Sequence, residues 1–290
     1  MDGIINLLKP AGMTSHDLVY IIRKKFDRVK TGHTGTLDPM AVGVLPICVG
    51  KATRITEYLD LDFKKYRCEL QLGIETDTQD IWGTILKETK VEVSEDAIKE
   101  AVASFEGDIF QTPPEYSAIR VNGKRLYEYA RQGEKVEIKS RKIHMKEIHI
   151  IEIDMEHNKV MLDVVCSKGT YIRTLCSDIG KKLGCGGTMS FLLRTASGRF
   201  KIEDTLTIEE LDHFDIDKHL FPTDYPLEIL GKIQLQNKKQ YEMVLNAMNN
   251  IKGKKYLFSK HKSYILNQIE LEKINGENER KRKFMEKDWY

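Results

Sequence analysis

A single carboxylate, Asp38, lies in the stretch GHTGTLDPMAVGVLP, which runs from residue 32 to residue 46. Gly32 and Gly35 allow the backbone to approach a ligand closely, and a carboxylate beside a cation stays ionised, as a nucleophile must. The chemistry indicated is nucleophilic catalysis by one acid. An Asp-Pro pair is also a common start of a turn, in which the carboxylate bonds nearby amides. Taken alone, the local sequence favours the turn.

A cationic partner for this carboxylate is available at Arg173, in the segment YIRTLCSDIGKKLG. Apolar residues three or four apart predict a helix with one buried face, formed by Ile172, Leu175, Ile179 and Leu183. Arg173 lies at the start of this helix and away from that face, so its side chain can face another segment. The sequence does not show whether it meets Asp38.

A phosphate-binding loop is suggested by Gly50 and Lys51, which follow an apolar run. That motif requires a glycine at the position of Leu45 and a serine or threonine at the position of Ala52. The motif therefore fails at two positions, and the sequence argues against hydrolysis of a nucleoside triphosphate.

A cation site is suggested by Asp77 and Asp80 in ETDTQD. No glutamate follows at the spacing of an EF-hand loop, and the chain has no HExxH motif. Carboxylates that bond their own turn are the favoured interpretation. We predict no metal site.

Positive charge is concentrated in one segment, although the whole chain of 290 residues has a formal charge of only +2. Residues 120–146 contain nine Lys or Arg and three Glu, which gives this segment a charge of +6. Tyrosines are interleaved with the cations, and RNA-binding surfaces combine cations that reach phosphates with rings that stack on bases. The candidate RNA-binding residues are Lys124, Arg125, Tyr127, Arg131, Arg141 and Lys142. A solvated basic surface has the same composition.

The composition, 41% hydrophobic and 31% charged, suits one large domain with an appendage, or two domains. No apolar run is long enough for a membrane span, and the opening MDGIINLLKP lacks the basic start of a signal peptide. The five cysteines are odd in number and never spaced as CxxC, which favours reduced thiols over disulfides or a zinc site. We expect a soluble cytoplasmic protein without a membrane partner.

Several elements that must position these residues are predicted by hydrophobic periodicity and capping residues. Strands are expected at 3–9, 42–50 and 66–73, and a hairpin at 148–154 and 159–166. Helices are expected at 16–26, after an N-cap at Thr14 or Ser15, and from Ser94 to near Gly107. Pro222 and Pro226 mark the expected domain boundary.

Motifs in five parts of the chain, between residues 9 and 200, resemble the TruB family of bacterial tRNA pseudouridine synthases. They are KPAGMTS (9–15), GHTGTLDPMAVGVLP (32–46), KKYRCELQLGIETDTQD (64–80), PPEYSAIRVNGKRLYEYARQG (113–133), and CSKGTYIRTL with LLRTASGRF (166–200). The resemblance implies isomerisation of uridine 55, in the T arm of tRNA, to pseudouridine. It also implies that Asp38 is the catalytic residue. Attack on the ribose C1′, attack on the uracil C6 and assisted elimination to a glycal all remain open.

The same resemblance implies roles for further residues. His33 matches a residue that occupies the stack vacated by the extruded uridine, and the extrusion itself costs free energy. Tyr66 matches a tyrosine that stacks on the flipped base, and Arg173 matches an arginine that pairs with the catalytic acid. The remaining matches are Tyr171, near the base, and Leu192, an apolar wall of the pocket.

The implied fold is α+β, a pseudouridine synthase fold with a mixed, largely antiparallel sheet flanked by helices. Residues 1–225 are expected to form the catalytic domain, with an RNA-binding insertion at about 110–145. Residues 226–290 match no motif of the family, and we expect a reduced or divergent PUA-type module there. The reaction involves no redox change, so no metal, nucleotide or organic cofactor is expected. The expected partner is the T-arm stem-loop of tRNA, bound by a monomer.

Two other functions use the same features. A non-catalytic tRNA-binding or folding factor would need the basic segment and not Asp38. A guide-RNA-dependent pseudouridine synthase subunit would need a bound small RNA, whereas the presence of the insertion favours a stand-alone enzyme.

Overall fold

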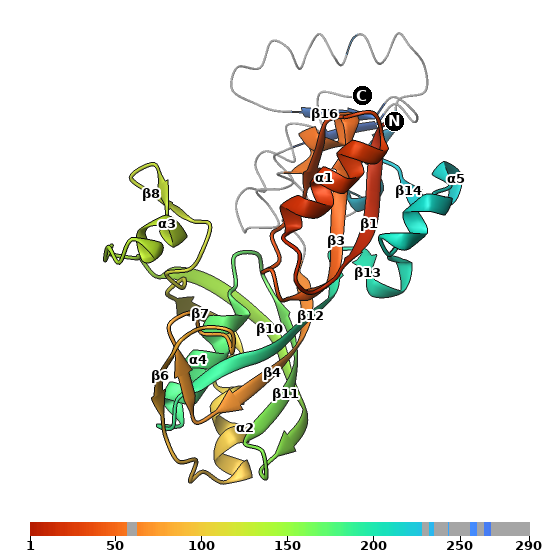
Figure 1. The fold of residues 1–290 in the computed structure, drawn as a ribbon. Helices are drawn as coiled ribbons and strands as arrows, with labels where there is room; N and C mark the ends of the chain where they lie inside the picture. Colours follow the sequence, from red (N-terminus) through yellow and green to blue (C-terminus); the bar gives the residue numbers. More distant parts are fainter. Residues whose placement is uncertain (57–62, 228–231, 235–242, 244–255, 260–263, 268–290) are drawn as a thin grey trace.

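A long, twisted sheet forms the body of the protein in the computed structural model, which describes residues 1–56, 63–227, 232–234, 243, 256–259 and 264–267. Ten described strands make up this sheet, in the order β14-β1-β3-β12-β4-β11-β10-β7, with β2 beside β3 and β13 beside β12 (Figure 1). Their bounds are β1 (Gly3–Lys9), β2 (Thr31–His33), β3 (Val42–Val49), β4 (Lys64–Leu72), β7 (Gly107–Gln111), β10 (Arg141–Asp154), β11 (Lys159–Cys166), β12 (Gly187–Ser197), β13 (Phe200–Lys201) and β14 (Leu220–Phe221).

Strand pairing in this sheet is antiparallel except between β3 and β12, which run parallel. Three helices pack against the sheet: α1 (Ser15–Lys25), α2 (Glu95–Ala103) and α4 (Ile172–Lys182). The short α5 (Ile216–His219) precedes β14 and has no buried residue. Short 3-10 helices are η1 (Gly50–Arg54), η3 (Ile202–Asp204), η4 (Glu209–His213) and η5 (Tyr225–Leu227). The predicted α+β class with a mixed, largely antiparallel sheet is confirmed.

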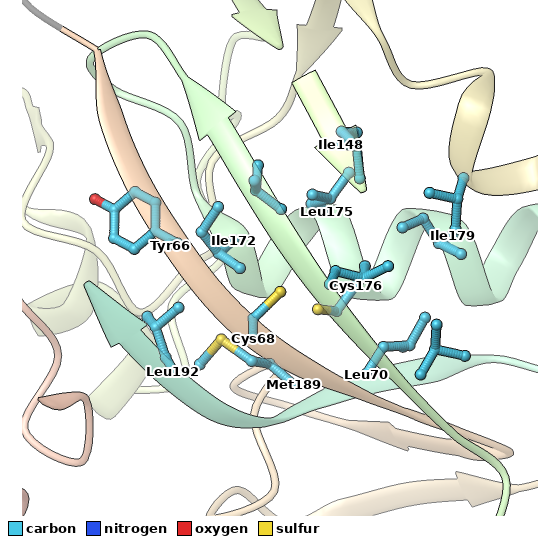
Figure 2. Packing of buried hydrophobic residues seen from close by; sticks show 14 of the residues in the cluster. Tyr66, Cys68, Leu70, Ile148, Ile172, Leu175, Cys176, Ile179, Met189 and Leu192 are labelled. Carbon is cyan, nitrogen blue, oxygen red and sulfur yellow. The ribbon is translucent and has the colours of Figure 1, made fainter. Parts of the chain in front are cut away.

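The larger apolar core lies between the sheet and helices α2 and α4. Figure 2 shows Leu175, Cys176 and Ile179 of α4 directed at Cys68 and Leu70 of β4. The buried face predicted for α4 is confirmed, because Leu175 and Ile179 are fully buried. All five cysteines are free and buried. Burial of a Leu or Ile side chain stabilises the folded protein by about 1.5–3 kcal/mol, and these contacts hold α4 in a fixed position on the sheet.

A second core lies between α1 and strands β1 and β3. The helix begins after Thr14, whose side chain accepts a hydrogen bond from the Asp17 N–H while the Asp17 carboxylate accepts one from the Thr14 N–H. This capping box fixes the start of α1, and Thr14 is the N-cap, one of the two residues predicted for that position. Leu18 and Ile22 are fully buried against the sheet.

The parallel contact between β3 and β12 requires a glycine at position 43. Gly43 is opposite Arg194 and has a φ of +125°, which a residue with a side chain rarely adopts. A Cβ atom there would overlap the Arg194 carbonyl oxygen and lie 2.7 Å from its backbone nitrogen. The close approach joins the α1 half of the sheet to the α4 half.

Residues 112–140 project from the sheet between β7 and β10, whose adjacent ends pair Gln111 with Arg141. This insertion contains β8 (Arg120–Val121), β9 (Lys124–Arg125) and α3 (Leu126–Arg131), and it stands apart from the sheet in Figure 1. A hairpin of β5 (Ile74–Thr76) and β6 (Ile85–Glu88) follows β4.

Beyond residue 227, the described residues form a three-stranded antiparallel sheet of β15 (Lys232–Gln234), β17 (Tyr264–Asn267) and β16 (Tyr256–Ser259). Most of the expected C-terminal domain, residues 226–290, lies outside the described residues, so the PUA-type prediction stays a prediction. Among the described helices, none has the length and apolar character needed to cross a membrane.

Candidate active site

Asp38 lies in the connection between β2 and β3, residues 34–41, which we call the Asp38 loop. The loop is fixed from the side of α1 by Ser15, whose hydroxyl accepts a hydrogen bond from the Leu37 N–H at 2.9 Å and donates to the Leu37 carbonyl at 3.1 Å. Leu37 itself is buried in the larger core. The residue before the carboxylate is thus anchored by both its backbone and its side chain.

Lys9, at the end of β1, fixes the other side of the Asp38 loop. Its ammonium group donates to the carbonyls of Pro10, Pro39 and Ala41 at 2.8, 2.9 and 2.7 Å. The side chain is fully buried, and burial lowers the pKa of Lys9 to about 8. The sequence offered no sign of this role, because a lysine at a strand end usually faces solvent.

Arg173 reaches the carboxylate from the first turn of α4. Its Nε lies 2.8 Å from Asp38 Oδ2, and its NH2 group donates to Asp38 Oδ1 at 3.2 Å. The arginine side chain is only 5% exposed, whereas that of Asp38 is 37% exposed. The structure therefore brings together the two residues that the sequence could not place near each other, with the acid open to a ligand and the cation behind it.

Further bonds of the guanidinium tie two other segments to the site. NH1 donates to the Thr78 carbonyl at 2.9 Å, and NH2 donates to the Tyr116 carbonyl at 3.0 Å. Thr78 lies in the turn that connects β5 to β6, and Tyr116 belongs to the insertion. Arg173 is accordingly the point at which the sheet, the turn and the insertion meet the Asp38 loop.

Asp80 is a second acid beside the same guanidinium, with its Oδ2 3.8 Å from NH1 of Arg173. Its other oxygen accepts from the Thr78 hydroxyl at 2.8 Å and from the Trp82 N–H at 3.2 Å, as expected for a turn-forming aspartate. Burial raises the pKa of Asp80. Sequence reasoning found the turn and missed the arginine, because no local pattern relates position 80 to position 173.

Tyr66 and Leu192 lie on the same face of the sheet, on the adjacent strands β4 and β12. Both are buried and belong to the larger core, where Figure 2 shows the Tyr66 hydroxyl directed away from Cys68 and Met189. Burial raises the pKa of Tyr66 to about 12, so the phenol is neutral at physiological pH.

Tyr171 is the N-cap residue of α4, two positions before Arg173. Its N–H donates to the Gln111 side chain at 2.8 Å, and its carbonyl accepts from the same side chain at 3.0 Å. Burial raises the pKa of Tyr171, while a hydrogen bond with Ser117 and the charge of Arg141 lower it. Tyr171 therefore lies where α4 meets the base of the insertion.

His33 is the last residue of β2, opposite Ile47 of β3, and it precedes the Asp38 loop directly. It is half-buried.

The candidate RNA-binding residues fall into two groups. In the insertion, two guanidinium groups lie near the Tyr127 ring, that of Arg125 at 5.7 Å and that of Arg131 at 5.4 Å from its centroid. Lys124 lies over the neighbouring Tyr129 ring at 4.3 Å. The second group, Arg141 and Lys142, is at the start of β10, where Lys142 forms an ion pair with Asp108 at 2.8 Å.

No group of three or more His, Cys, Asp or Glu side chains with the arrangement of a metal site occurs among the described residues.

Two solved structures share this fold. A chain of a Cbf5-Nop10-Gar1 complex is 32% identical, with a TM-score of 0.65 over 84% of this chain and 67% of its own. A chain of an H/ACA RNP bound to a substrate RNA containing 2′-deoxyuridine is 28% identical, with a TM-score of 0.64 over 91% of this chain and 70% of its own.

Two family models together match residues 23–228. Residues 23–172 match the N-terminal domain of the TruB family of pseudouridylate synthases, and residues 173–228 match the C-terminal domain of tRNA pseudouridylate synthase B. With the shared fold, these matches define a pseudouridylate synthase.

Curated relatives narrow the assignment further. The tRNA pseudouridine synthase B of Alkaliphilus oremlandii is 58% identical over 80% of this chain and 77% of its own length. The tRNA pseudouridine synthase B of Clostridioides difficile is 49% identical over 81% of this chain and 80% of its own length. The chain belongs to the TruB family, as its motifs predicted.

Proposed function

We propose that this protein isomerises uridine 55, in the T arm of tRNA, to pseudouridine, with Asp38 as the catalytic nucleophile. The observation that carries the proposal is the ion pair of Asp38 with Arg173, in which the acid is partly open and the arginine is buried. Membership of the TruB family supplies the reaction, and the tRNA comes from the names of relatives that are up to 58% identical.

The reaction breaks the bond from uracil N1 to ribose C1′ and forms a bond from C5 to the same C1′. C5 loses its hydrogen and N1 gains one, so reactant and product have the same composition and oxidation state. The proposal therefore includes no cofactor. One carboxylate suffices as the nucleophile, and the buried guanidinium of Arg173 keeps a positive charge beside it.

The surroundings of the pair support the roles proposed for the other residues. A flipped uracil would stack on Tyr66, whose phenol is neutral, with Leu192 forming an apolar wall on the adjacent strand. Tyr171 would contact the base from the start of α4. His33, which directly precedes the Asp38 loop, would fill the stack that the uridine leaves, offsetting part of the cost of extrusion.

The insertion would hold the T-arm stem-loop. The pair of guanidinium groups near Tyr127 offers phosphate contacts and a ring for stacking, and Arg141 and Lys142 extend the positive surface towards the site. Arg173 bonds the insertion at Tyr116, so an RNA held there is coupled mechanically to the catalytic pair. The proposal has the protein act as a monomer in the cytoplasm, in keeping with five free thiols.

The test is to incubate the protein with an unmodified tRNA transcript, without added metal, and to map pseudouridine chemically at each uridine. We expect product at position 55 with the wild-type protein. Asp38→Asn should form no product while it binds the tRNA with an affinity close to that of the wild type.

A matched control is Asp178→Asn, because Asp178 lies on α4, has a side chain 33% exposed and forms an ion pair with Lys181. This variant should retain activity. Wild-type protein that leaves position 55 unmodified would refute the proposed function.

The two alternatives give different results in the same assays. A non-catalytic tRNA-folding factor would keep its effect on tRNA refolding in the Asp38→Asn variant and would form no product in either protein. A guide-dependent subunit would convert the transcript only after addition of a small RNA that copurifies with it.

A further inference from the structure

Arg194 is a fully buried cation that touches neither Asp38 nor Arg173 through any hydrogen bond or ion pair found among the described residues. Its side chain lies in β12 and is 1% exposed. The Nε–H donates to the Val44 carbonyl at 2.7 Å, and the NH2 group donates to the Gly35 carbonyl at 3.2 Å. Because an uncompensated buried charge costs several kcal/mol, these bonds are needed to keep the guanidinium in place.

The position of Arg194 in the sheet places it near both the Asp38 loop and Tyr66. Its backbone is opposite Gly43 on β3 and opposite Tyr66 on β4. Residues opposite each other on antiparallel strands direct their side chains to the same face, so Arg194 and Tyr66 are neighbours. Gly35, which accepts from the guanidinium, is three residues before Asp38 in the Asp38 loop.

The Arg194 side chain lies beside Tyr66, its cross-strand neighbour, and its charge acts on the phenol. Burial raises the pKa of Tyr66, and the charge of Arg194 with a side-chain hydrogen bond from it lowers that pKa. Gly35 is close on the other side, since a Cβ atom there would lie 3.7 Å from NH1 of Arg194 and 3.6 Å from Nζ of Lys64. One guanidinium thus lies between the Asp38 loop and the tyrosine.

We propose that Arg194 is a positioning residue, which sets the separation between the Asp38 loop and the Tyr66 ring so that a flipped uridine fits between the nucleophile and its stacking partner. This inference rests on the proposed function. An arginine suits the task because its planar fork presents several N–H groups in fixed directions, whereas a lysine ammonium acts as a single point charge. Small errors in the placement of a reacting group lower rates steeply, which gives the residue a catalytic effect without contact with the substrate.

The test compares Arg194→Gln with Arg67→Gln in single-turnover conversion of the tRNA transcript. Arg67 is a matched control, because it lies on β4 next to Tyr66 and its guanidinium forms two bonds of 2.7 Å with Asp163, in a more exposed site. We expect Arg194→Gln to lower the maximal rate by about 10- to 100-fold, the effect of losing one or two charge-assisted hydrogen bonds. The Kd for tRNA should stay within about threefold of the wild-type value, since the RNA does not reach this side chain.

A double-mutant cycle with Tyr66→Phe separates positioning from a general loss of structure. Part of the effect of Arg194 passes through the Tyr66 hydroxyl. The rate loss of the double variant should therefore be smaller, by a factor of at least about three, than the product of the two single-variant rate losses. A purely structural arginine would give independent effects. Circular dichroism at the assay temperature establishes that each variant is folded.

If Arg194→Gln does not fold, Arg194→Lys replaces it, with an expected rate loss of about 5- to 20-fold because one of the two bonds is kept. The inference is overturned if the folded variant matches Arg67→Gln within twofold in rate, if the rate loss is explained by a weaker Kd, or if the cycle shows independent effects. Failure of the proposed function would look different, because the wild-type protein itself would then form no pseudouridine.

Discussion

Replacement of Arg173 by methionine removes the cation behind the proposed nucleophile and keeps most of the apolar volume of the side chain. Three contacts set the size of the effect: the Asp38 ion pair at 2.8 Å and the hydrogen bonds to the Thr78 and Tyr116 carbonyls at 2.9 and 3.0 Å. Removing one partner of a buried ion pair costs about 3–5 kcal/mol. Asp38 is 37% exposed, so water screens part of this effect and we take the lower end, about 3 kcal/mol.

A loss of about 3 kcal/mol in the transition state corresponds to a rate roughly 150-fold lower. Arg173→Lys should lose about tenfold, because an ammonium restores the charge and cannot reach Asp38 and both carbonyls together. The assay is single-turnover formation of pseudouridine at saturating protein, with the Kd for tRNA measured separately. Arg67→Met, which removes an arginine of strand β4 that is paired with Asp163, is the control and should retain the wild-type rate.

The reasoning would be refuted by a folded Arg173→Met variant that keeps its rate within threefold of the wild type. It would also be refuted if Arg173→Lys were as slow as Arg173→Met, since the charge would then contribute nothing.

Three further predictions concern stability and RNA binding. Lys9→Met should lower the free energy of unfolding by about 2–4 kcal/mol at pH 8, because three carbonyls lose their donor. Burial lowers the pKa of Lys9 from 10.5 to about 8, so between these pH values the unfolded chain binds more protons than the folded protein. The contribution of Lys9 to the free energy of unfolding therefore rises with pH. Urea unfolding at pH 8 and pH 10 should show this rise in the wild type and not in Lys9→Met. Gly43→Ala should lower the free energy of unfolding by at least about 3 kcal/mol, because it strains the backbone and overlaps Arg194. The control is Gly32→Ala, which has no atom within 4 Å of its Cβ position and should change the free energy of unfolding by less than about 0.5 kcal/mol. Thermal unfolding measures both. Tyr127→Ala should raise the Kd for tRNA by about 5- to 100-fold through lost stacking and leave the saturated rate unchanged, and Tyr20→Ala, which removes an exposed tyrosine of α1, should alter neither.

Local elements of this fold follow from the sequence because their causes are local. The N-cap of α1 at Thr14 and the apolar face of α4 depend on residues within one helical turn of each other, and both are found as predicted. The strands 3–9 and 159–166 have the predicted bounds.

Contacts between distant segments were outside the reach of local patterns. The ion pair of Asp38 with Arg173 joins residues 135 apart in the chain, and only the resemblance to a family suggested it. Lysine and arginine are usually exposed, but Lys9 and Arg194 are fully buried. Their burial depends on which carbonyls the folded sheet directs at them, and spacing along one segment carries no information about that.

The reaction itself offers the most direct test, since formation of the C5–C1′ bond releases the hydrogen on C5. A tRNA transcript with tritium at C5 of its uridines should release one equivalent of tritium with the wild-type protein, none with Asp38→Asn, and none when position 55 carries cytidine. Tritium release by Asp38→Asn at the wild-type rate, or continued release after loss of uridine 55, would contradict the assignment of Asp38 as the nucleophile acting on that base.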